Sequence, residues 1–158
     1  MRAVALGKLN LPERGVLWDV GAGSGSIAIE CARLAPGLAV FAIERSADDA
    51  DRIRRNVAAH AVRVAVVHSE APAAFVGLPA PDRVFVGGGG LDVLEQALAV
   101  LRPDGRLVAT HVLVDRAAAA WRLLGNSVQV SVARGAPIAD GFRLQAENPV
   151  FISWGPLP

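Results

Sequence analysis

The residues with the clearest chemical meaning form a run of alternating glycines at positions 19–25, which read Asp-Val-Gly-Ala-Gly-Ser-Gly. An apolar run at 16–18 precedes them and another at 27–29 follows, so the glycines stand where a buried strand turns into a helix. Such a turn needs backbone without a Cβ, because it adopts positive φ and lets a ligand lie against the chain. The spacing predicts a site for a nucleoside-bearing molecule; a purely structural strand-to-helix turn is the alternative.

The glycine spacing distinguishes classes of nucleotide ligand. The dinucleotide fingerprint G-x-G-x-x-G requires a third glycine at position 26, where this chain has Ser26. The pattern D-x-G-x-G-x-G is instead typical of S-adenosylmethionine methyltransferases, and a small NAD(P)-binding oxidoreductase domain stays the alternative. A P-loop is excluded because G-x-x-x-x-G-K-[ST] occurs nowhere in the sequence. The candidate cofactor-binding residues of the turn are Asp19, Gly21, Ala22, Gly23, Ser24 and Gly25.

Further cofactor candidates stand at the ends of the next predicted strands, where ligands of open parallel sheets gather. Glu44, with Arg45 beside it, is the first charge after the apolar run 39–43 and is predicted to accept hydrogen bonds from both ribose hydroxyls. Glu70 or the backbone of Ala71 would bind the adenine amino group. Asp19 would orient the glycine turn or bind the methionine ammonium through water. Ordinary surface carboxylates are the alternative for Glu44 and Glu70.

Four successive glycines and one histidine follow the fourth and fifth predicted strands. The glycines at 87–90 permit close approach of a ligand, with Gly87 expected at the cofactor and Gly88 at the substrate; a flexible loop is the alternative. His111 is the best-placed residue to carry a proton, and a purely structural role for this histidine is the alternative. His60 and His68 are weaker candidates for catalysis.

Composition narrows the class of protein. A chain of 158 residues, 53% hydrophobic and 20% charged, is expected to form a single globular domain. A net charge of +1 without a basic segment gives no support for a nucleic-acid partner. Cys31 is the only cysteine, so an intrachain disulfide is impossible and a thiolate metal cluster is excluded; no metal site is predicted, and a reducing cytoplasm fits best. No apolar run is long enough to span a membrane.

Apolar runs and helical spacing alternate along the chain. The predicted strands are 16–20, 39–44, 62–68, 82–86, 106–112, the alternating segment 128–133 and 149–154. The predicted helices are 2–9, 26–35, one beginning at Ser46, 72–76, 91–101 and 115–124, and a long loop is expected over 135–145. The first helix lacks a capping residue, so the start looks like a cut. The predicted fold class is α/β, of the class I methyltransferase type, with a seven-stranded, mostly parallel sheet and a terminal antiparallel hairpin.

Several stretches go beyond the general fold and resemble the decarboxylating precorrin carbon-15 methyltransferases of cobalamin biosynthesis. They are 2–6, 8–9, 16–26, 42–45, 81–88 and 147–152. The resemblance implies that S-adenosylmethionine binds at residues 21–25, Glu44 and Ala71, that a short segment carrying part of the pocket precedes the first helix, and that the protein is a tetramer. In some members this activity is the C-terminal half of a bifunctional precorrin-6Y C5,15-methyltransferase, which implies an N-terminal precorrin methyltransferase domain beside residues 1–158.

The resemblance weakens after the sixth predicted strand. Of the Ser-Arg and Lys-Pro pairs, the aromatic, the His and the Arg expected there, the two arginines survive as Arg134 and Arg143. Their guanidinium groups would bind the acetate and propionate carboxylates of a tetrapyrrole, and solvated loop arginines are the alternative. The implied reaction is methylation at carbon 15 coupled to loss of the carboxyl group from the carbon-12 acetate. A methyltransferase for another small molecule is the alternative.

Overall fold

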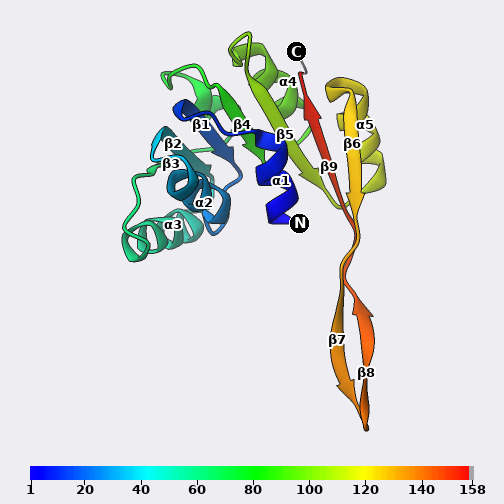
Figure 1. Ribbon diagram of the computed structural model, residues 1–158. Helices are drawn as coiled ribbons and strands as arrows, with labels where there is room; N and C mark the ends of the chain where they lie inside the picture. Colours follow the sequence, from blue (N-terminus) through cyan, green and yellow to red (C-terminus); the bar gives the residue numbers. More distant parts are fainter. Residues whose placement is uncertain (157–158) are drawn as a thin grey trace.

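The computed structural model describes residues 1–156, in which one seven-stranded sheet lies between helices and a two-stranded hairpin projects from its edge (Figure 1). The order of strands in the sheet is β3-β2-β1-β4-β5-β9-β6. The first five strands are parallel to one another. They are β1 (Arg14–Val20), β2 (Gly37–Glu44), β3 (Ala65–His68), β4 (Arg83–Val86) and β5 (Arg106–His111). Their order reverses at β1, so β1, β2 and β4 end beside one another at the switch point.

The last strand closes the sheet in the opposite direction. β9 (Val150–Gly155) lies between β5 and β6 (Asn126–Val130) and runs antiparallel to both. Ile152 faces Thr110 on one side and Val128 on the other, and its side chain is fully buried. The predicted fold, with a mostly parallel sheet and one reversed strand near an edge, is confirmed.

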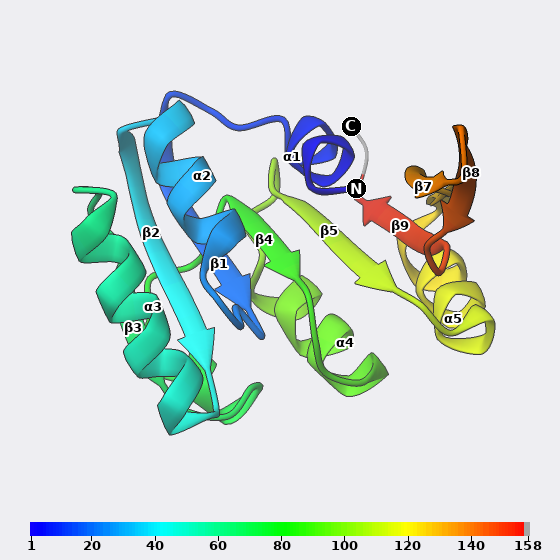
Figure 2. The same cartoon turned by 90° about the horizontal axis from the view of Figure 1, so that it is seen from below.

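Helices cover both faces of the sheet (Figure 2). Packed on one face are α1 (Arg2–Leu9), α2 (Ser26–Leu34) and α3 (Ala47–Ala59). Packed on the other are α4 (Leu91–Val100), α5 (Val114–Leu124) and the 3-10 turn η1 (Ala73–Phe75). None of the helices within residues 1–156 is long and apolar enough to cross a bilayer.

Continuous apolar sequence explains why the central strands are buried on both faces. Successive side chains of a strand point to opposite faces, so Leu17 enters the cluster beneath α2 while Trp18 enters the cluster beneath η1 and stacks on Phe75. The predicted start of α3 is confirmed, because the Ser46 Oγ accepts a hydrogen bond of 3.3 Å from the backbone N–H of Asp49. These elements fix the strand ends that carry the candidate site.

Two elements are shorter than predicted. β3 begins at Ala65 and not at residue 62, and the helix expected over 72–76 is the single turn η1. Both deviations lie at the outer end of the sheet, where β3 pairs only with β2 and its burial is incomplete. Weak burial gives a weak apolar pattern, so the limits of such an element are poorly marked in the sequence.

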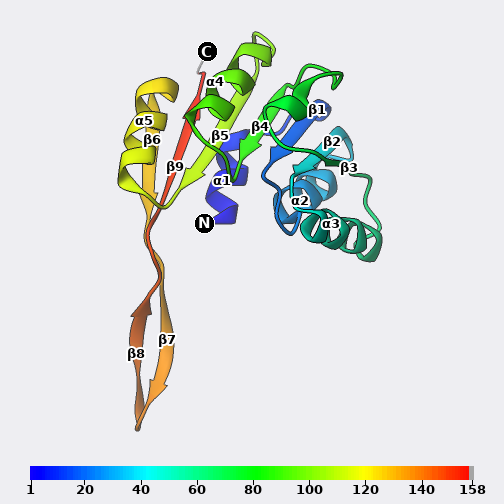
Figure 3. The same ribbon diagram turned by 180° about the vertical axis from the view of Figure 1, so that it is seen from behind.

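The loop predicted over 135–145 is wrong. Residues there form β7 (Ala133–Ile138) and β8 (Gly141–Ala146), an antiparallel hairpin that extends away from the sheet and is called the arm below (Figures 1 and 3). Within residues 1–156 the two strands of the arm pair only with each other, and the large apolar side chains Ile138, Phe142 and Leu144 are exposed. Without a buried face, the period-two pattern that marks a strand has no core to follow, and the glycines and proline there suggest a loop.

Candidate active site

A hollow lies at the carboxyl ends of β1, β2 and β4, at the switch point of the sheet. This cofactor pocket has a volume of about 480 Å³. Its walls come from the end of β1, the end of β2, the segment after β3 and the glycines after β4. Lining it are Val20, Gly21, Ile43, Glu44, Arg45, Ser69, Glu70, Ala71, Gly88, Gly89, Gly90, Asp92, Val93 and Arg116. Six of the predicted cofactor or substrate residues therefore meet around one space, namely Gly21, Glu44, Arg45, Glu70, Ala71 and Gly88.

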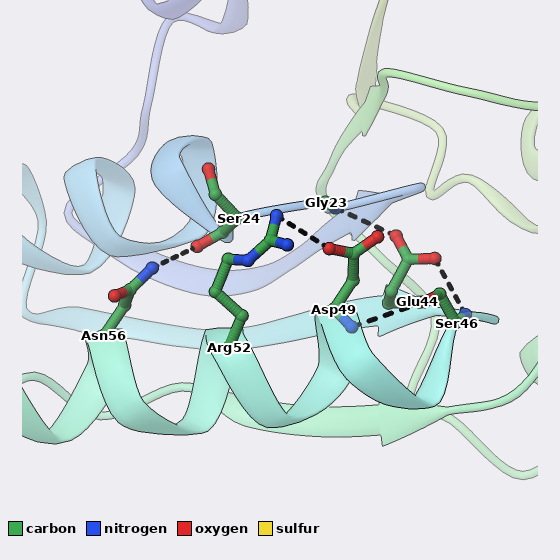
Figure 4. A network of polar contacts seen from close by, with 7 residues as sticks. All are labelled: Gly23, Ser24, Glu44, Ser46, Asp49, Arg52 and Asn56. Atoms are coloured by element: carbon green, nitrogen blue, oxygen red, sulfur yellow. Dashed lines mark hydrogen bonds and ion pairs between the residues drawn. The ribbon is translucent and has the colours of Figure 1, made fainter.

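Glu44 connects the glycine turn to the start of α3 (Figure 4). One carboxylate oxygen accepts a hydrogen bond of 2.9 Å from the backbone N–H of Gly23, and the other accepts one of 3.0 Å from Ser46. Only 8% of the residue is exposed, and it lines the cofactor pocket. These two hydrogen bonds fix the position of the Glu44 side chain. Each carboxylate oxygen has a further lone pair, so Glu44 can still accept hydrogen bonds from a ligand in the pocket.

The glycine turn is held between β2 and the glycines that follow β4. Backbone N–H groups of Gly21 and Ala22 both donate to the carbonyl oxygen of Ile43, at 2.9 and 3.2 Å. Gly21 has φ +69°, and a Cβ on it would lie 2.9 Å from the backbone nitrogen of Gly88. This close approach requires glycine, because the neighbouring atoms belong to backbone. In the rest of the turn, Gly23 donates a hydrogen bond to Glu44 and Ser24 accepts one from Asn56 (Figure 4). Gly25 lies against Ile53 of α3.

Asp19 is buried behind the turn with one oxygen unpartnered. Its Oδ2 accepts a hydrogen bond of 2.9 Å from the N–H of Ala28, whereas Oδ1 has no hydrogen-bond partner within the described residues. Burial raises the pKa of Asp19 to about 7; the bond from Ala28 opposes this shift and the nearby charge of Glu44 adds to it. Asp19 and Ala22 line a second hollow of about 280 Å³ beside α1, which shares Gly21 with the cofactor pocket. A buried acceptor without a donor is suited to a ligand or to water.

The cofactor pocket is acidic in its lining. Three carboxylates, Glu44, Glu70 and Asp92, face two guanidinium groups, Arg45 and Arg116. Arg45 and Glu70 form an exposed ion pair of 3.2 Å at the rim. Glu70 was predicted to bind the adenine amino group, and in the structure its carboxylate is engaged by Arg45. The Ala71 backbone lies beside it in the pocket. An excess of negative charge suits a cationic sulfonium and ammonium, and is unfavourable for a pyrophosphate.

His111 lies in a separate hollow of about 240 Å³ at the ends of β4 and β5, called the β5 pocket. Its Nε2 is buried without a hydrogen-bond partner among the described residues. Burial lowers the pKa of His111, and the charge of Arg116 lowers it further. The β5 pocket shares Gly88 and Gly89 with the cofactor pocket and also takes in Gly87.

Two predicted substrate residues lie elsewhere. Arg134 and Arg143 are on the arm, and neither is among the residues that line the pockets described above. Arg134 pairs with Glu147. Sequence reasoning missed Arg116, which lines both the cofactor pocket and the β5 pocket. It stands in an alanine-rich helix with no motif around it, and only its position two residues after Val114, where α5 begins behind β5, could have indicated it.

Comparison with known proteins agrees with this geometry. The family model described as "Precorrin methyltransferase domain" matches residues 1–155. A precorrin-6Y C(5,15)-methyltransferase [decarboxylating] from Sinorhizobium sp is 42% identical over 87% of this chain and 35% of its own length. This chain therefore spans about a third of that relative. A cobalt-precorrin-6B C(15)-methyltransferase (decarboxylating) from Salmonella typhimurium is 34% identical over 96% of this chain and 84% of its own.

A solved structure shows the same fold. The crystal structure of a precorrin-6y C5,15-methyltransferase from Geobacter metallireducens superposes with a TM-score of 0.88 at 34% identity, covering 97% of this chain and 84% of that one. The NAD(P)-binding alternative is thereby set aside in favour of a methyltransferase. Because the family model matches residues 1–155 and the Salmonella typhimurium relative is 34% identical over 96% of this chain, the chain belongs to the precorrin methyltransferase family.

Proposed function

We propose that the protein methylates a precorrin at carbon 15 with S-adenosylmethionine and decarboxylates the acetate arm at carbon 12, a step of cobalamin biosynthesis. The observation that carries the proposal is the acidic pocket at the switch point, where Glu44 is fixed between the glycine turn and α3. The similarity of this chain, over nearly its full length, to a decarboxylating carbon-15 methyltransferase also supports the proposal.

The predicted cofactor residues would divide the ligand among themselves. Glu44 would accept hydrogen bonds from the ribose hydroxyls, and the segment at Ala71 would contact the adenine edge. The unpartnered oxygen of Asp19 would accept a hydrogen bond from the methionine ammonium, directly or through water. S-adenosylmethionine, when bound, supplies an electrophilic methyl group. The task of these residues is to position it, because the electron-rich ring carbon needs no strong base.

The second half of the reaction breaks a carbon–carbon bond. Methyl transfer leaves a positive charge in the conjugated ring, and the electron pair of the broken bond to the acetate carboxyl neutralises it as carbon dioxide leaves. A proton then adds to the exposed methylene carbon, while another leaves the ring. His111 is the group proposed to move this proton, since it lines the β5 pocket and burial lowers the pKa of its ring, which keeps the ring uncharged at neutral pH.

The product mass tests the proposed function. Incubation of the protein with precorrin-6B, with and without cobalt in the ring, and S-adenosylmethionine is expected to give a product that has gained one methyl group and lost one carbon dioxide. Mass spectrometry measures both changes on the same molecule. A methylated product that keeps its acetate would refute the coupled reaction, and an unmodified tetrapyrrole would refute the proposal altogether.

A variant of Glu44 tests the proposed cofactor site separately from the reaction. Glu44→Ala is expected to weaken S-adenosylhomocysteine binding, measured by calorimetry, by at least about tenfold, because it removes a charged acceptor from the ribose position. Equal affinities would remove Glu44 from the site. Asp51→Asn, on the exposed side of α3, is expected to leave the affinity unchanged.

We also propose that the protein is a homo-oligomer, with a tetramer as the predicted state. The arm supports this proposal. Cross-strand pairing places Phe142 opposite Pro137 and Leu144 opposite Gly135 on one side of the hairpin, and Phe142 and Leu144 are 72% and 70% exposed. A lone two-stranded hairpin is marginal in water, so a second copy is the simplest cover for this side. Arg134 and Arg143 would reach a substrate only through such an assembly. A cytoplasmic location and an attached N-terminal precorrin methyltransferase domain stay predictions.

The arm makes the oligomer proposal testable. Phe142→Asp combined with Leu144→Asp is expected to reduce the molar mass measured by light scattering during size-exclusion chromatography, because buried charge at an apolar contact is strongly unfavourable. Val76→Asp, at an 88% exposed position off the arm, is the matched control and should leave the mass unchanged. An unaltered mass in the arm variant would contradict the assignment of the interface.

A further inference from the structure

The β5 pocket differs from the cofactor pocket in charge. The cofactor pocket has three carboxylates in its lining, whereas the β5 pocket has none among the described residues. Arg116 is the one side chain of the β5 pocket with a permanent charge, again among residues 1–156. Two adjoining spaces of opposite character suit two ligands of opposite charge, a cationic methyl donor and an anionic acceptor.

Arg116 stands at the boundary between the two spaces. It lines both pockets, together with Gly88 and Gly89. Since glycine has no side chain, the guanidinium group of Arg116 is the principal side chain on this boundary. A ligand group held by Arg116 would lie next to the glycines, beside both the methyl donor and the β5 pocket.

The guanidinium group of Arg116 is also largely uncommitted. Within residues 1–156 no carboxylate lies at ion-pair distance from it, and its recorded contact is a long hydrogen bond of 3.5 Å to the carbonyl oxygen of Gly89. Arg45 and Arg134, by contrast, are paired with Glu70 and Glu147. An arginine with free donors presents the planar fork that binds a carboxylate through two parallel hydrogen bonds.

Apolar residues continue the β5 pocket outward. Val112 and Leu113 line it, are 62% and 56% exposed, and are followed by the equally exposed Val114. Together these three residues form an apolar rim next to the cation. A conjugated ring that carries carboxylate arms offers the matching combination of an apolar face and peripheral negative charge.

We infer that Arg116 binds a side-arm carboxylate of the tetrapyrrole, with the ring face on the apolar rim of Val112, Leu113 and Val114, and so determines which ring carbon meets the methyl donor. The inference rests on the proposed function and names a substrate-positioning residue within it.

The experiment compares three variants of α5 in the intact protein loaded with S-adenosylhomocysteine. Arg116→Gln removes the charge, Arg116→Lys keeps the charge without the planar fork, and Arg122→Gln alters an exposed arginine of the same helix that lines neither pocket. The probe is uroporphyrin, a stable tetrapyrrole with eight carboxylates, titrated by fluorescence. Its octamethyl ester serves as the uncharged probe.

Arg116→Gln is expected to weaken uroporphyrin binding about 10- to 100-fold, Arg116→Lys less, and Arg122→Gln not at all. Affinity for the ester and for S-adenosylhomocysteine should be the same in all variants. In turnover of precorrin-6B, Arg116→Gln should raise KM more than it lowers kcat. Uroporphyrin binding that is absent in the wild type, or equal in wild type and Arg116→Gln, would overturn the inference. A wild type that binds uroporphyrin through Arg116 but leaves precorrin-6B unmodified would instead refute the proposed function alone.

Discussion

Replacing Asp19 with asparagine is expected to remove the pH dependence of cofactor binding and most of its strength. A ligand ammonium favours the ionised carboxylate, so the wild-type affinity for S-adenosylhomocysteine should rise between pH 6 and pH 8, as Asp19 with its pKa of about 7 ionises. In Asp19→Asn the affinity at pH 8 should be lower by at least about tenfold, with a flat profile. Calorimetry at pH 6, 7 and 8 measures both effects. Parallel profiles for the two proteins would exclude Asp19 from the cofactor site.

The same substitution changes the stability of the ligand-free protein. Folding raises the pKa of Asp19 from 3.8 to about 7, so the neutral carboxyl stabilises the fold below pH 3.8 and this contribution is lost as the pH rises through 7. One pKa unit corresponds to about 1.4 kcal/mol, so the wild type should lose roughly 2 to 4 kcal/mol over this window relative to Asp19→Asn. Urea unfolding of both proteins at pH 5 and pH 8 measures how much unfolding free energy each protein loses between these two pH values. Equal losses in the two proteins would show that Asp19 is not buried as the structure has it.

The second large effect is expected at Gly21. Gly21→Ala places a Cβ 2.9 Å from the nitrogen and 3.0 Å from the Cα of Gly88, and neither backbone atom can rotate away. The two glycine segments must separate, which should cost roughly 2 to 4 kcal/mol of unfolding free energy and abolish measurable S-adenosylhomocysteine binding. Thermal or urea unfolding and calorimetry provide the two measurements.

Gly125→Ala is the matched control for Gly21→Ala. Gly125 also has a left-handed backbone, with φ +85°, but a Cβ there would have no neighbour within 4 Å and it lies at the end of α5. This variant should show only the conformational cost of positive φ, about 1 to 2 kcal/mol, with cofactor binding intact. Equal losses in both variants would mean that backbone strain, and not the contact with Gly88, explains the effect at Gly21.

Much of the sheet could be predicted because its central strands are buried on both faces. Apolar runs such as 39–43 end abruptly at a charge or a glycine, and the physical boundary coincides with the sequence boundary. Glu44 was found for the same reason, as the first charge after such a run. The arm could not be found in this way, because Phe142 and Leu144 stay 72% and 70% exposed and no buried face imposes a strand pattern on this segment.

The limits of site prediction have a different cause. The spacing of residues 19–25 reveals a turn, yet the ionisation of Asp19 depends on desolvation by neighbours far away in the sequence. The pairing of Arg45 with Glu70 joins the ends of two strands and no local motif encodes it. Arg116 belongs to the site only because α5 begins beside the glycines that follow β4. Such properties come from three-dimensional proximity, which short sequence patterns do not contain.

The position of β9 has a consequence for how the chain acquires its structure during synthesis. Among the described residues, β9 is the one strand that pairs with β6, and it is also the outer neighbour of β5. Both β5 and β6 therefore lack this partner before residues 150–155 leave the ribosome. Val150 also contributes to the wall of the β5 pocket. The nascent protein must therefore keep an unpaired edge at β5 until β9 inserts, a delay that favours chaperone binding and leaves the wall of the β5 pocket incomplete until then.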